Sequence, residues 1–257
     1  MASNDSTSKT IIVALALCIV CSVFVSTAAV MLRPAQQANK DLDRKTNILA
    51  AAGLLKQGVS VDQQFESVKT RAVDLTTGKF TDAVNVSSYD QRKAAKDPAQ
   101  SEDLSDDQDI AKIGRRANYA LVYIVENDSG LDKIILPIKG YGLWSTLYGF
   151  VALEADLNTV AGLGFYEHAE TPGLGGEVDN PLWKAKWIGK KAYDENSHAV
   201  LSVIKGSVDS TRPEAVHQVD GLSGATLTSR GVDNLVKFWM GENGFAPFLA
   251  NLRAGEA

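Results

Sequence analysis

The feature that most constrains this chain is an uncharged stretch near its N-terminus. Ile11 to Leu32 comprises 22 residues without a formal charge, and a helix needs about 20 residues to cross the hydrocarbon core of a bilayer. A cleaved signal peptide is the alternative, and Ser26-Thr-Ala-Ala29 has the small residues of a cleavage region. The apolar core of such a peptide is usually only about 7–15 residues long. We therefore predict a single uncleaved transmembrane helix over residues 11–32, after a short N-terminal segment of residues 1–10.

The charges around this stretch give a weak signal for its orientation. Lys9 and the amino terminus precede it, and four cations follow it: Arg33, Lys40, Arg44 and Lys45. Because cytoplasmic flanks carry more Lys and Arg, this count favours a cytoplasmic body. The bias comes from few residues, and Asp41 and Asp43 dilute it.

Composition narrows the function classes. The chain has 257 residues and a formal net charge of −5, and it lacks a basic block, which argues against nucleic acid as a partner. Its two cysteines, Cys18 and Cys21, both lie in the apolar stretch, so the rest of the chain has no disulfide and no thiol nucleophile. On a membrane helix the two share one face, where packing against neighbouring helices is the simpler interpretation. Shared ligation of an iron centre with a partner subunit is the alternative.

The segment after the apolar stretch has helical and loop-like patterns. We predict an amphipathic helix over residues 34–57 that ends at Gly58. A second helix is expected to run to about Lys69, because Ser60-Val-Asp-Gln63 has the form of a capping box. The acidic patch Glu102-Asp-Leu-Ser-Asp-Asp107 lacks the spacing of a calcium loop, so a solvated loop is expected there.

Four short runs rich in Val, Ile, Leu, Tyr and Phe then follow: Tyr119–Val125, Lys133–Lys139, Leu147–Ala155 and Val160–Glu167. Closely spaced turn clusters separate them, which favours antiparallel hairpins over βαβ units. A helix near residues 181–190, a strand at 200–205 and a helix after Thr228 complete the pattern. The sequence thus predicts an α+β domain over residues 117–257 with an antiparallel sheet and flanking helices. Residues 33–116 are expected to form a helical, loop-rich region next to the membrane.

A hydroxyl-rich turn, Asp220-Gly-Leu-Ser-Gly-Ala-Thr-Leu-Thr-Ser229, precedes the last predicted helix. Apolar residues then recur at helical spacing, at Val232, Leu235, Val236 and Trp239. Gly224 and Ala225 let a ligand approach the main chain closely, and the free N–H groups of a helix start favour a phosphate. Helix capping by Ser and Thr is the common alternative for such a turn, and the residues alone leave both interpretations open.

Two segments resemble the signatures of a known family. Ser223-Gly-Ala-Thr-Leu-Thr228, with Asp220 upstream, resembles the flavinylation motif of the FMN-binding domain family. In that family FMN is joined through its phosphate to the hydroxyl of the last Ser or Thr of the motif, which corresponds here to Thr228. Glu170-Thr-Pro-Gly-Leu-Gly175 resembles the signature that lies against the isoalloxazine ring. Over the whole chain the resemblance is to the C subunits of Na⁺-translocating NADH:quinone oxidoreductases, with the G subunits of Rnf-type complexes as near relatives.

The resemblance implies an FMN site built from three segments: Asp220, Ser223, Gly224, Ala225, Thr226, Leu227 and Thr228; Glu170, Thr171 and Leu174; and Trp144. Trp144 is expected to stack near the ring and Leu174 to cover it. Packing is the usual role of a lone Trp, and a plain turn is the alternative for Thr171-Pro-Gly173. Trp183 and Trp187, four residues apart on a predicted helix, are expected in the core.

Other redox or hydrolytic sites find little support in the sequence. The three histidines, His168, His198 and His217, have neither triad nor metal-ligand spacing, and His168 is at most a hydrogen-bond donor to the cofactor. Gly173-Leu-Gly-Gly176 lacks the full dinucleotide fingerprint, so no NADH site is expected on this chain.

The resemblance also implies a role and a location. It implies an electron carrier in the bacterial inner membrane, with a short cytoplasmic N-terminus (residues 1–10), one span and a periplasmic domain. This orientation is opposite to the weak charge bias. The chain would relay single electrons between an iron–sulfur centre in the membrane subunits and another covalently bound FMN, on the route from NADH to ubiquinone coupled to Na⁺ export. A separate flavin transferase, using FAD and Mg²⁺, would attach the FMN. A cofactor-free, membrane-anchored assembly module and an FMN-carrying sensor domain are the alternatives.

Overall fold

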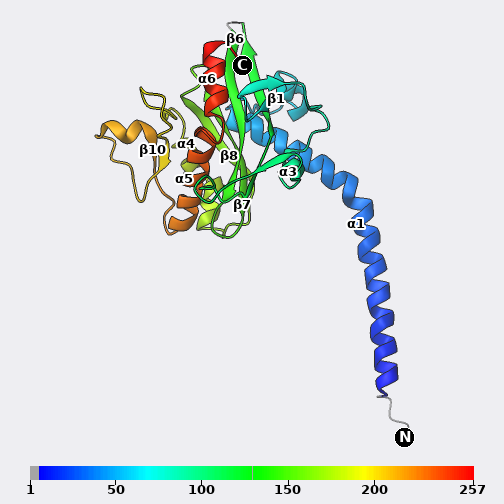
Figure 1. Cartoon of the computed structure of the whole chain (residues 1–257). Coiled ribbons are helices and arrows are strands. Elements are labelled where there is room, and N and C mark those ends of the chain that lie inside the picture. Colours follow the sequence, from blue (N-terminus) through cyan, green and yellow to red (C-terminus); the bar gives the residue numbers. More distant parts are fainter. Residues whose placement is uncertain (1–5, 129) are drawn as a thin grey trace. The chain divides into compact units, whose positions relative to one another are not determined.

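The computed structural model describes residues 6–128 and 130–257 (Figure 1). Two compact units divide the chain, the first ending at Asp43 and the second comprising Arg44–Ala257. The fold combines one long N-terminal helix with a domain of mixed sheet and helices, as the sequence predicts.

The N-terminal helix α1 (Thr7–Ala51) contains the whole predicted span and continues through Pro34 without a break. It is long and apolar enough to cross a membrane, with a mean hydropathy of 2.7 over its most apolar window. The helix predicted over residues 34–57 is present as the second half of α1, but it ends at Ala51 and not at Gly58. The helix stops at Gly53, which has a φ of 68°. Its N–H and that of Leu54 bond back to the carbonyls of Ala50 and Leu49, a Schellman closure that favours glycine.

The second predicted helix is correct at its start and wrong at its end. In α2 (Val61–Phe65) the Ser60 hydroxyl accepts a hydrogen bond from the Gln63 N–H, as the capping box requires. The helix does not reach Lys69, because strand β1 (Val68–Asp74) begins one residue before it and pairs along its whole length with β5 (Tyr119–Asn127).

An antiparallel sheet of six strands forms the centre of the domain, in the order β2-β1-β5-β6-β7-β8. The four runs predicted as strands are confirmed as β5 (Tyr119–Asn127), β6 (Gly130–Tyr141), β7 (Thr146–Glu154) and β8 (Val160–Glu167). The sheet also takes β1 and β2 (Lys79–Thr81) from residues 33–116, the segment expected to be helical and loop-rich.

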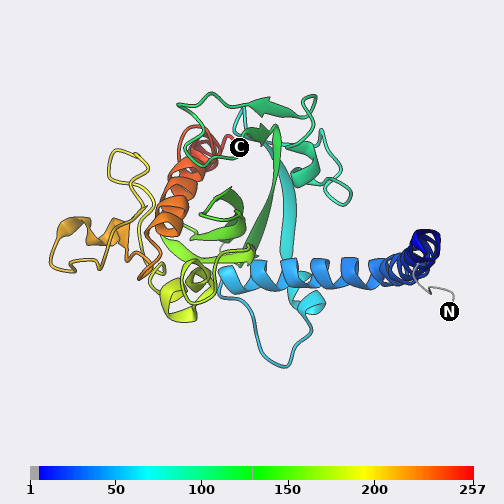
Figure 2. The same cartoon turned by 90° about the horizontal axis from the view of Figure 1, so that it is seen from below.

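Each face of the sheet carries its own hydrophobic cluster, because side chains alternate along a strand. Ala120, Val122 and Ile124 of β5 belong to the larger cluster, with residues of α5 (Thr226–Met240) and α6 (Ala246–Ala254). In Figures 1 and 2 these two helices, orange and red, lie together on one side of the green strands. Tyr123 and Val125 belong to the smaller cluster, with residues from the end of α1.

The remaining elements are short: α3 (Gln91–Ala94), β3 (Ser101–Asp103), β4 (Arg115–Ala117), the 3-10 turns η1 (Gly175–Asp179) and η2 (Pro213–His217), α4 (Pro181–Ala185), and the parallel pair β9 (Ser202–Val203) and β10 (Gln218–Val219). The predicted helix near 181–190 and strand at 200–205 therefore exist but are shorter than expected. Trp183 and Trp187 are buried in the larger cluster, as predicted. Helix α5 begins at Thr226 rather than after Thr228, which changes the geometry of the motif.

Candidate functional site

Three segments that are distant in sequence meet at the start of α5. They are the loop 142–145 between β6 and β7, the loop 168–174 after β8, and the turn 220–225 that leads into α5. Gly231 brings the helix close to the first loop: a Cβ there would lie 2.5 Å from the Tyr141 carbonyl oxygen and 2.8 Å from the Gly142 Cα.

Glu170, in the loop 168–174, connects the loop 142–145 to the first turn of α5. Its side chain is 4% exposed, and one carboxylate oxygen, Oε1, accepts hydrogen bonds from the consecutive N–H groups of Leu143, Trp144 and Ser145, at 3.0–3.2 Å. The other oxygen, Oε2, accepts from the Thr228 hydroxyl at 2.7 Å. The family signature predicts Glu170 at the cofactor, but both of its oxygens are occupied within the protein.

Hydrogen bonds determine the protonation state of Glu170. Burial by itself raises the pKa, but the bonds from the Thr228 hydroxyl and from the loop N–H groups outweigh it, so the pKa lies below the ordinary 4.5. An acid whose pKa is lowered by folding stabilises the folded state above its ordinary pKa, and this contribution is lost as the pH falls through the folded value.

This sign gives a testable pH dependence. We expect Glu170→Gln to be less stable than wild type at pH 7, because the variant lacks the ionised acceptor. The gap in melting temperature is expected to narrow as the pH falls from 4.5 through the lower folded pKa, because the wild-type carboxylate then also becomes neutral. Thermal unfolding of both proteins at pH 7 and pH 3 measures this; a gap of the same size at both values would contradict it.

The two threonines of the motif have opposite environments. Thr228, the third residue of α5, is 1% exposed and its hydroxyl is bonded to Glu170. Thr226, the first residue of the helix, is exposed. Because successive residues turn by about 100° around a helix, the two side chains point to opposite sides. The burial of Thr228 conflicts with the sequence-based choice of this residue for attachment, which rests on its place as the last hydroxyl of the motif.

The rest of the motif shapes the turn. Gly224 has a φ of 73°, which glycine adopts at little cost, and Ser223 beside it is exposed. The buried Ser229 hydroxyl accepts from the Leu222 N–H at 2.8 Å and donates to the Ala225 carbonyl. Ser229 therefore closes the turn, a role that sequence reasoning missed.

Asp220 is half-buried at the base of the turn. Its carboxylate accepts hydrogen bonds from the Val208 N–H and from the Lys186 ammonium, and its carbonyl accepts from the Trp183 indole. Partial burial raises the pKa of Asp220, but the bonds from Lys186 and Val208 lower it overall. Asp220 thus ties the motif to α4 and to the loop after β9, rather than capping its own turn.

Several apolar side chains around the site are exposed. Trp144 is 66% exposed, Leu174 45% and Leu227 53%. A Trp that served only packing would be expected to be buried, as Trp183 and Trp187 are. Leu174 is also close to the motif, since a Cβ on Gly224 would lie 3.2 Å from its Cδ2. Thr171 is exposed in the same loop. Leu174 and Leu227 thus offer exposed apolar side chains at the motif, and Trp144 offers one on the loop that is bonded to Glu170.

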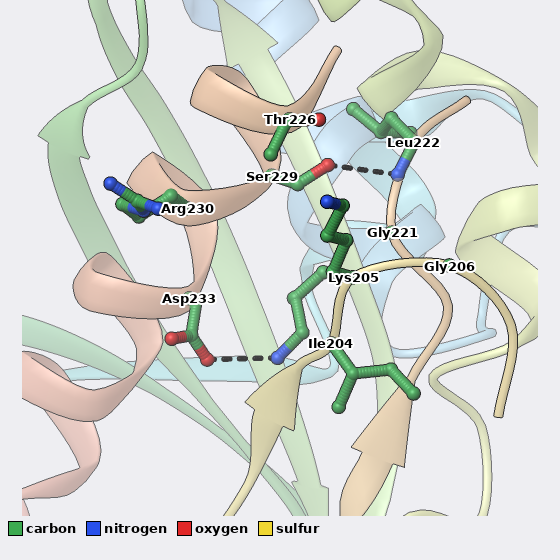
Figure 3. Close-up of a pocket in the computed structure, with 10 residues that line it drawn as sticks. Ile204, Lys205, Gly206, Gly221, Leu222, Thr226, Ser229, Arg230 and Asp233 are labelled. Atoms are coloured by element: carbon green, nitrogen blue, oxygen red, sulfur yellow. Dashed lines mark hydrogen bonds between the residues drawn. The ribbon is translucent and has the colours of Figure 1, made fainter. Parts of the chain in front are cut away.

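A pocket of about 140 Å³ lies beside Thr226 (Figure 3). Thr226 and Ser229 line it together with two cations, Lys205 and Arg230, and one carboxylate, Asp233. In Figure 3 the Lys205 side chain extends toward the first turn of α5. Among the ion pairs of the described residues, neither cation takes part in one. No local pattern indicates Lys205, because it is about 20 residues from the motif and only the fold brings it there.

His168 has a supporting role. Its Nδ1 accepts from the Glu170 N–H at 3.2 Å, and its Nε2 lies 2.7 Å from an Asp179 carboxylate oxygen. Both ring nitrogens are thus bonded within the protein, so His168 has no free ring nitrogen for a hydrogen bond to the cofactor.

Within the described residues no group of three or more His, Cys, Asp or Glu has the arrangement of a metal site. Cys18 and Cys21 are exposed free cysteines on α1.

Comparison with known proteins identifies the family. The model of the FMN-binding domain matches residues 142–241, the range that contains all three site segments. Over its full length the chain is 58% identical to the C subunit of the Na(+)-translocating NADH-quinone reductase of Pseudomonas aeruginosa, with all of both chains covered. The chain belongs to the family of C subunits of Na(+)-translocating NADH-quinone reductases.

Further relatives extend this match to solved structures. The C subunit of Vibrio vulnificus is 53% identical, with 99% of each chain covered. The crystal structure of Shewanella oneidensis NqrC has a TM-score of 0.77 at 41% identity, over 84% of this chain and 99% of that one. The C subunit from Parabacteroides distasonis has a TM-score of 0.64 at 27% identity, over 85% of this chain and 96% of that one. Of the two related families that the motifs resemble, the matches favour the C subunits over the Rnf-type relatives.

Proposed function

We propose that this chain is the FMN-carrying C subunit of a membrane Na⁺-translocating NADH:quinone reductase, and that it transfers single electrons within that complex. The observation that carries this proposal is the meeting of the two flavin signatures at one exposed site, inside the matched FMN-binding domain. FMN supplies the redox chemistry, since it accepts and donates electrons one at a time, and the protein supplies attachment and orientation.

We place the covalent attachment at Thr226 rather than at Thr228. The Thr226 hydroxyl is exposed at the first position of α5, where the free N–H groups and the positive end of the helix dipole favour a phosphate. Gly224 leaves open backbone beside it. An alkyl hydroxyl is a weak nucleophile without a base, so the proposed maturation partner is a separate flavin transferase that uses FAD and Mg²⁺.

Lys205 and Arg230 are proposed to neutralise the phosphodiester charge. Both line the pocket that contains Thr226, and neither has an ion-pair partner among the residues that the structure describes. Lys205→Gln is expected to lower the rate of FMN loading at limiting transferase, while leaving the melting temperature unchanged. Lys79→Gln is the matched control, because Lys79 is exposed on β2 and lies outside the pocket lining. Equal rates of FMN loading in both variants would mean that Lys205 does not contribute to binding the phosphate.

Trp144 and Leu174 are proposed to contact the isoalloxazine ring. Their exposed apolar surface beside the attachment point would be covered by a flat aromatic ring, which stabilises both partners. Trp144→Ala is therefore expected to shift the visible absorbance of the bound FMN while the covalent link remains intact. Absorbance spectra of wild type and variant check this, with Trp183→Phe in the core as a control. An unchanged absorbance spectrum would mean that Trp144 does not contact the isoalloxazine ring.

The proposed location follows from α1 and from the family. The apolar half of α1 would anchor the chain in the bacterial inner membrane, with the FMN-binding domain in the periplasm and the other subunits of the complex as partners. A C-terminal alkaline phosphatase fusion is expected to be active, since that enzyme folds only outside the cytoplasm. An inactive phosphatase fusion, together with an active cytoplasmic reporter fused at the same end, would show that the domain lies in the cytoplasm.

The test of the function is a comparison of membranes with and without the transferase. Full-length protein from cells that contain it is expected to give a fluorescent band in a denaturing gel and to co-purify with the other subunits. Protein made without the transferase is expected to be colourless. A chain that assembles with its partners yet never carries flavin would be a cofactor-free assembly module.

A further inference from the structure

The strongest unexplained feature of the site is the burial of Glu170. The side chain is 4% exposed, and a carboxylate is rarely buried unless charge-assisted hydrogen bonds satisfy it. Here three consecutive main-chain N–H groups and the Thr228 hydroxyl supply those bonds. The Ser145 hydroxyl lies 3.4 Å from the same oxygen as the loop N–H groups and accepts from the Ala169 N–H at 2.7 Å. The loop 142–145 is thus folded around one carboxylate.

Two glycines make room for this arrangement. A Cβ on Gly142 would lie 2.6 Å from the Glu170 Oε1, and a Cβ on Gly175 would lie 2.5 Å from the Thr228 Oγ1 and 2.7 Å from the Glu170 Oε2. Carbon atoms do not approach oxygen so closely, so any side chain at either position would push the carboxylate away from its donors. The family signature Glu170-Thr-Pro-Gly-Leu-Gly175 therefore holds both the carboxylate and the glycine that admits it.

We propose that Glu170 and Thr228 are positioning residues that lock the Trp144 loop (residues 142–145) onto the first turn of α5, and that neither touches the cofactor. The lock joins the loop that presents Trp144 to the helix turn that presents Thr226. It therefore fixes the distance between the aromatic surface and the attachment point. This assignment rests on the proposed function, because it gives the buried pair a role toward the FMN held at Thr226.

The charge of Glu170 gives the lock a second, measurable effect. The carboxylate lies between the Trp144 loop and α5, so a fixed negative charge is held close to the proposed ring site. In a poorly solvated place such a charge acts over several ångströms. It disfavours the addition of electrons to a nearby group. Removing the charge is therefore expected to raise the midpoint potential of the bound FMN, whereas a change that only weakens folding would leave the potential unchanged.

Amide hydrogen exchange on full-length protein made without the transferase tests the lock directly. In Glu170→Ala the amides of residues 143–145 are expected to exchange at least about tenfold faster, because each loses a charge-assisted hydrogen bond. Glu170→Gln keeps one carbonyl acceptor and is expected to show partial protection. Thr228→Val keeps the hydrogen bonds from residues 143–145 to Glu170. It is expected to speed amide exchange only at the start of α5. Glu177→Gln, seven residues along the chain and bonded to Asn180, is the matched control.

The same variants carrying FMN complete the test. We expect Glu170→Gln to raise the midpoint potential and to change the visible circular dichroism, and Glu177→Gln to change neither. Two results would overturn the assignment, even if Glu170→Ala did not fold. One is wild-type amide exchange both at residues 143–145 in Glu170→Gln and at the start of α5 in Thr228→Val. The other is a wild-type midpoint potential of the FMN in Glu170→Gln. A wild-type protein without FMN would overturn the proposed function, and the exchange data would still decide whether the lock exists.

Discussion

Thr226→Ala is expected to abolish covalent FMN and to leave a folded, membrane-bound protein. The Thr226 side chain is exposed at the first position of α5, so its loss removes the nucleophilic hydroxyl without opening the core. In-gel flavin fluorescence after denaturation measures the link, and the melting temperature of the variant checks the fold. We expect complete loss of the band with a melting temperature close to that of wild type.

The matched variant is Thr228→Val, which removes the buried hydroxyl and preserves the shape of the side chain. It is expected to keep the covalent flavin and to lose some stability, because the Glu170 carboxylate loses one hydrogen bond. If fluorescence were lost only in Thr228→Val, the assignment by motif order would be right. The Thr228 side chain would then have to become exposed to the transferase while FMN is attached.

Gly231→Ala is expected to damage the site through the backbone. The added Cβ would meet the Tyr141 carbonyl oxygen at 2.5 Å and the Gly142 Cα at 2.8 Å, and neither atom moves without shifting β6 or the Trp144 loop. Overpacking of this kind costs about 1–3 kcal/mol, more than the gain of about 1 kcal/mol from replacing a helical glycine. The net cost of about 1 kcal/mol corresponds to a melting temperature lower by about 2–4 °C for a domain of this size, and we also expect a lower yield of covalent flavin.

Gly164→Ala is the control for this substitution. Gly164 lies in β8 of the same sheet, but a Cβ there would have no heavy atom within 4 Å. Thermal unfolding of the two variants beside wild type separates the close approach of α5 from a general effect of replacing glycine. Equal melting temperatures for both variants would mean that α5 does not press on the Trp144 loop.

Much of the fold was predictable because its pattern is local. β5 to β8 are apolar runs joined by tight turns, and each pairs with its neighbour in sequence. β1 was missed because only three of its seven residues, Val68, Ala72 and Val73, are apolar, and because it follows a capping box. Its partner β5 begins about 45 residues after β1 ends, and such a pairing leaves no local signal.

The site was predictable in its segments but not in its roles. The motifs located the loops around Glu170 and Ser223, since both resemble family signatures. Which hydroxyl faces solvent depends on where α5 begins, and a shift of two residues reverses the direction of a helical side chain. The burial of Glu170 and the presence of Lys205 beside Thr226 depend on contacts between distant segments, which one sequence does not specify.

Covalent attachment of FMN at Thr226 is the central claim. The most direct measurement is the mass of the full-length protein purified from membranes that contain the flavin transferase, followed by peptide mapping. We predict a gain equal to FMN minus water, located at Thr226. A chain of unmodified mass, purified with its partner subunits and in the presence of the transferase, would contradict the claim.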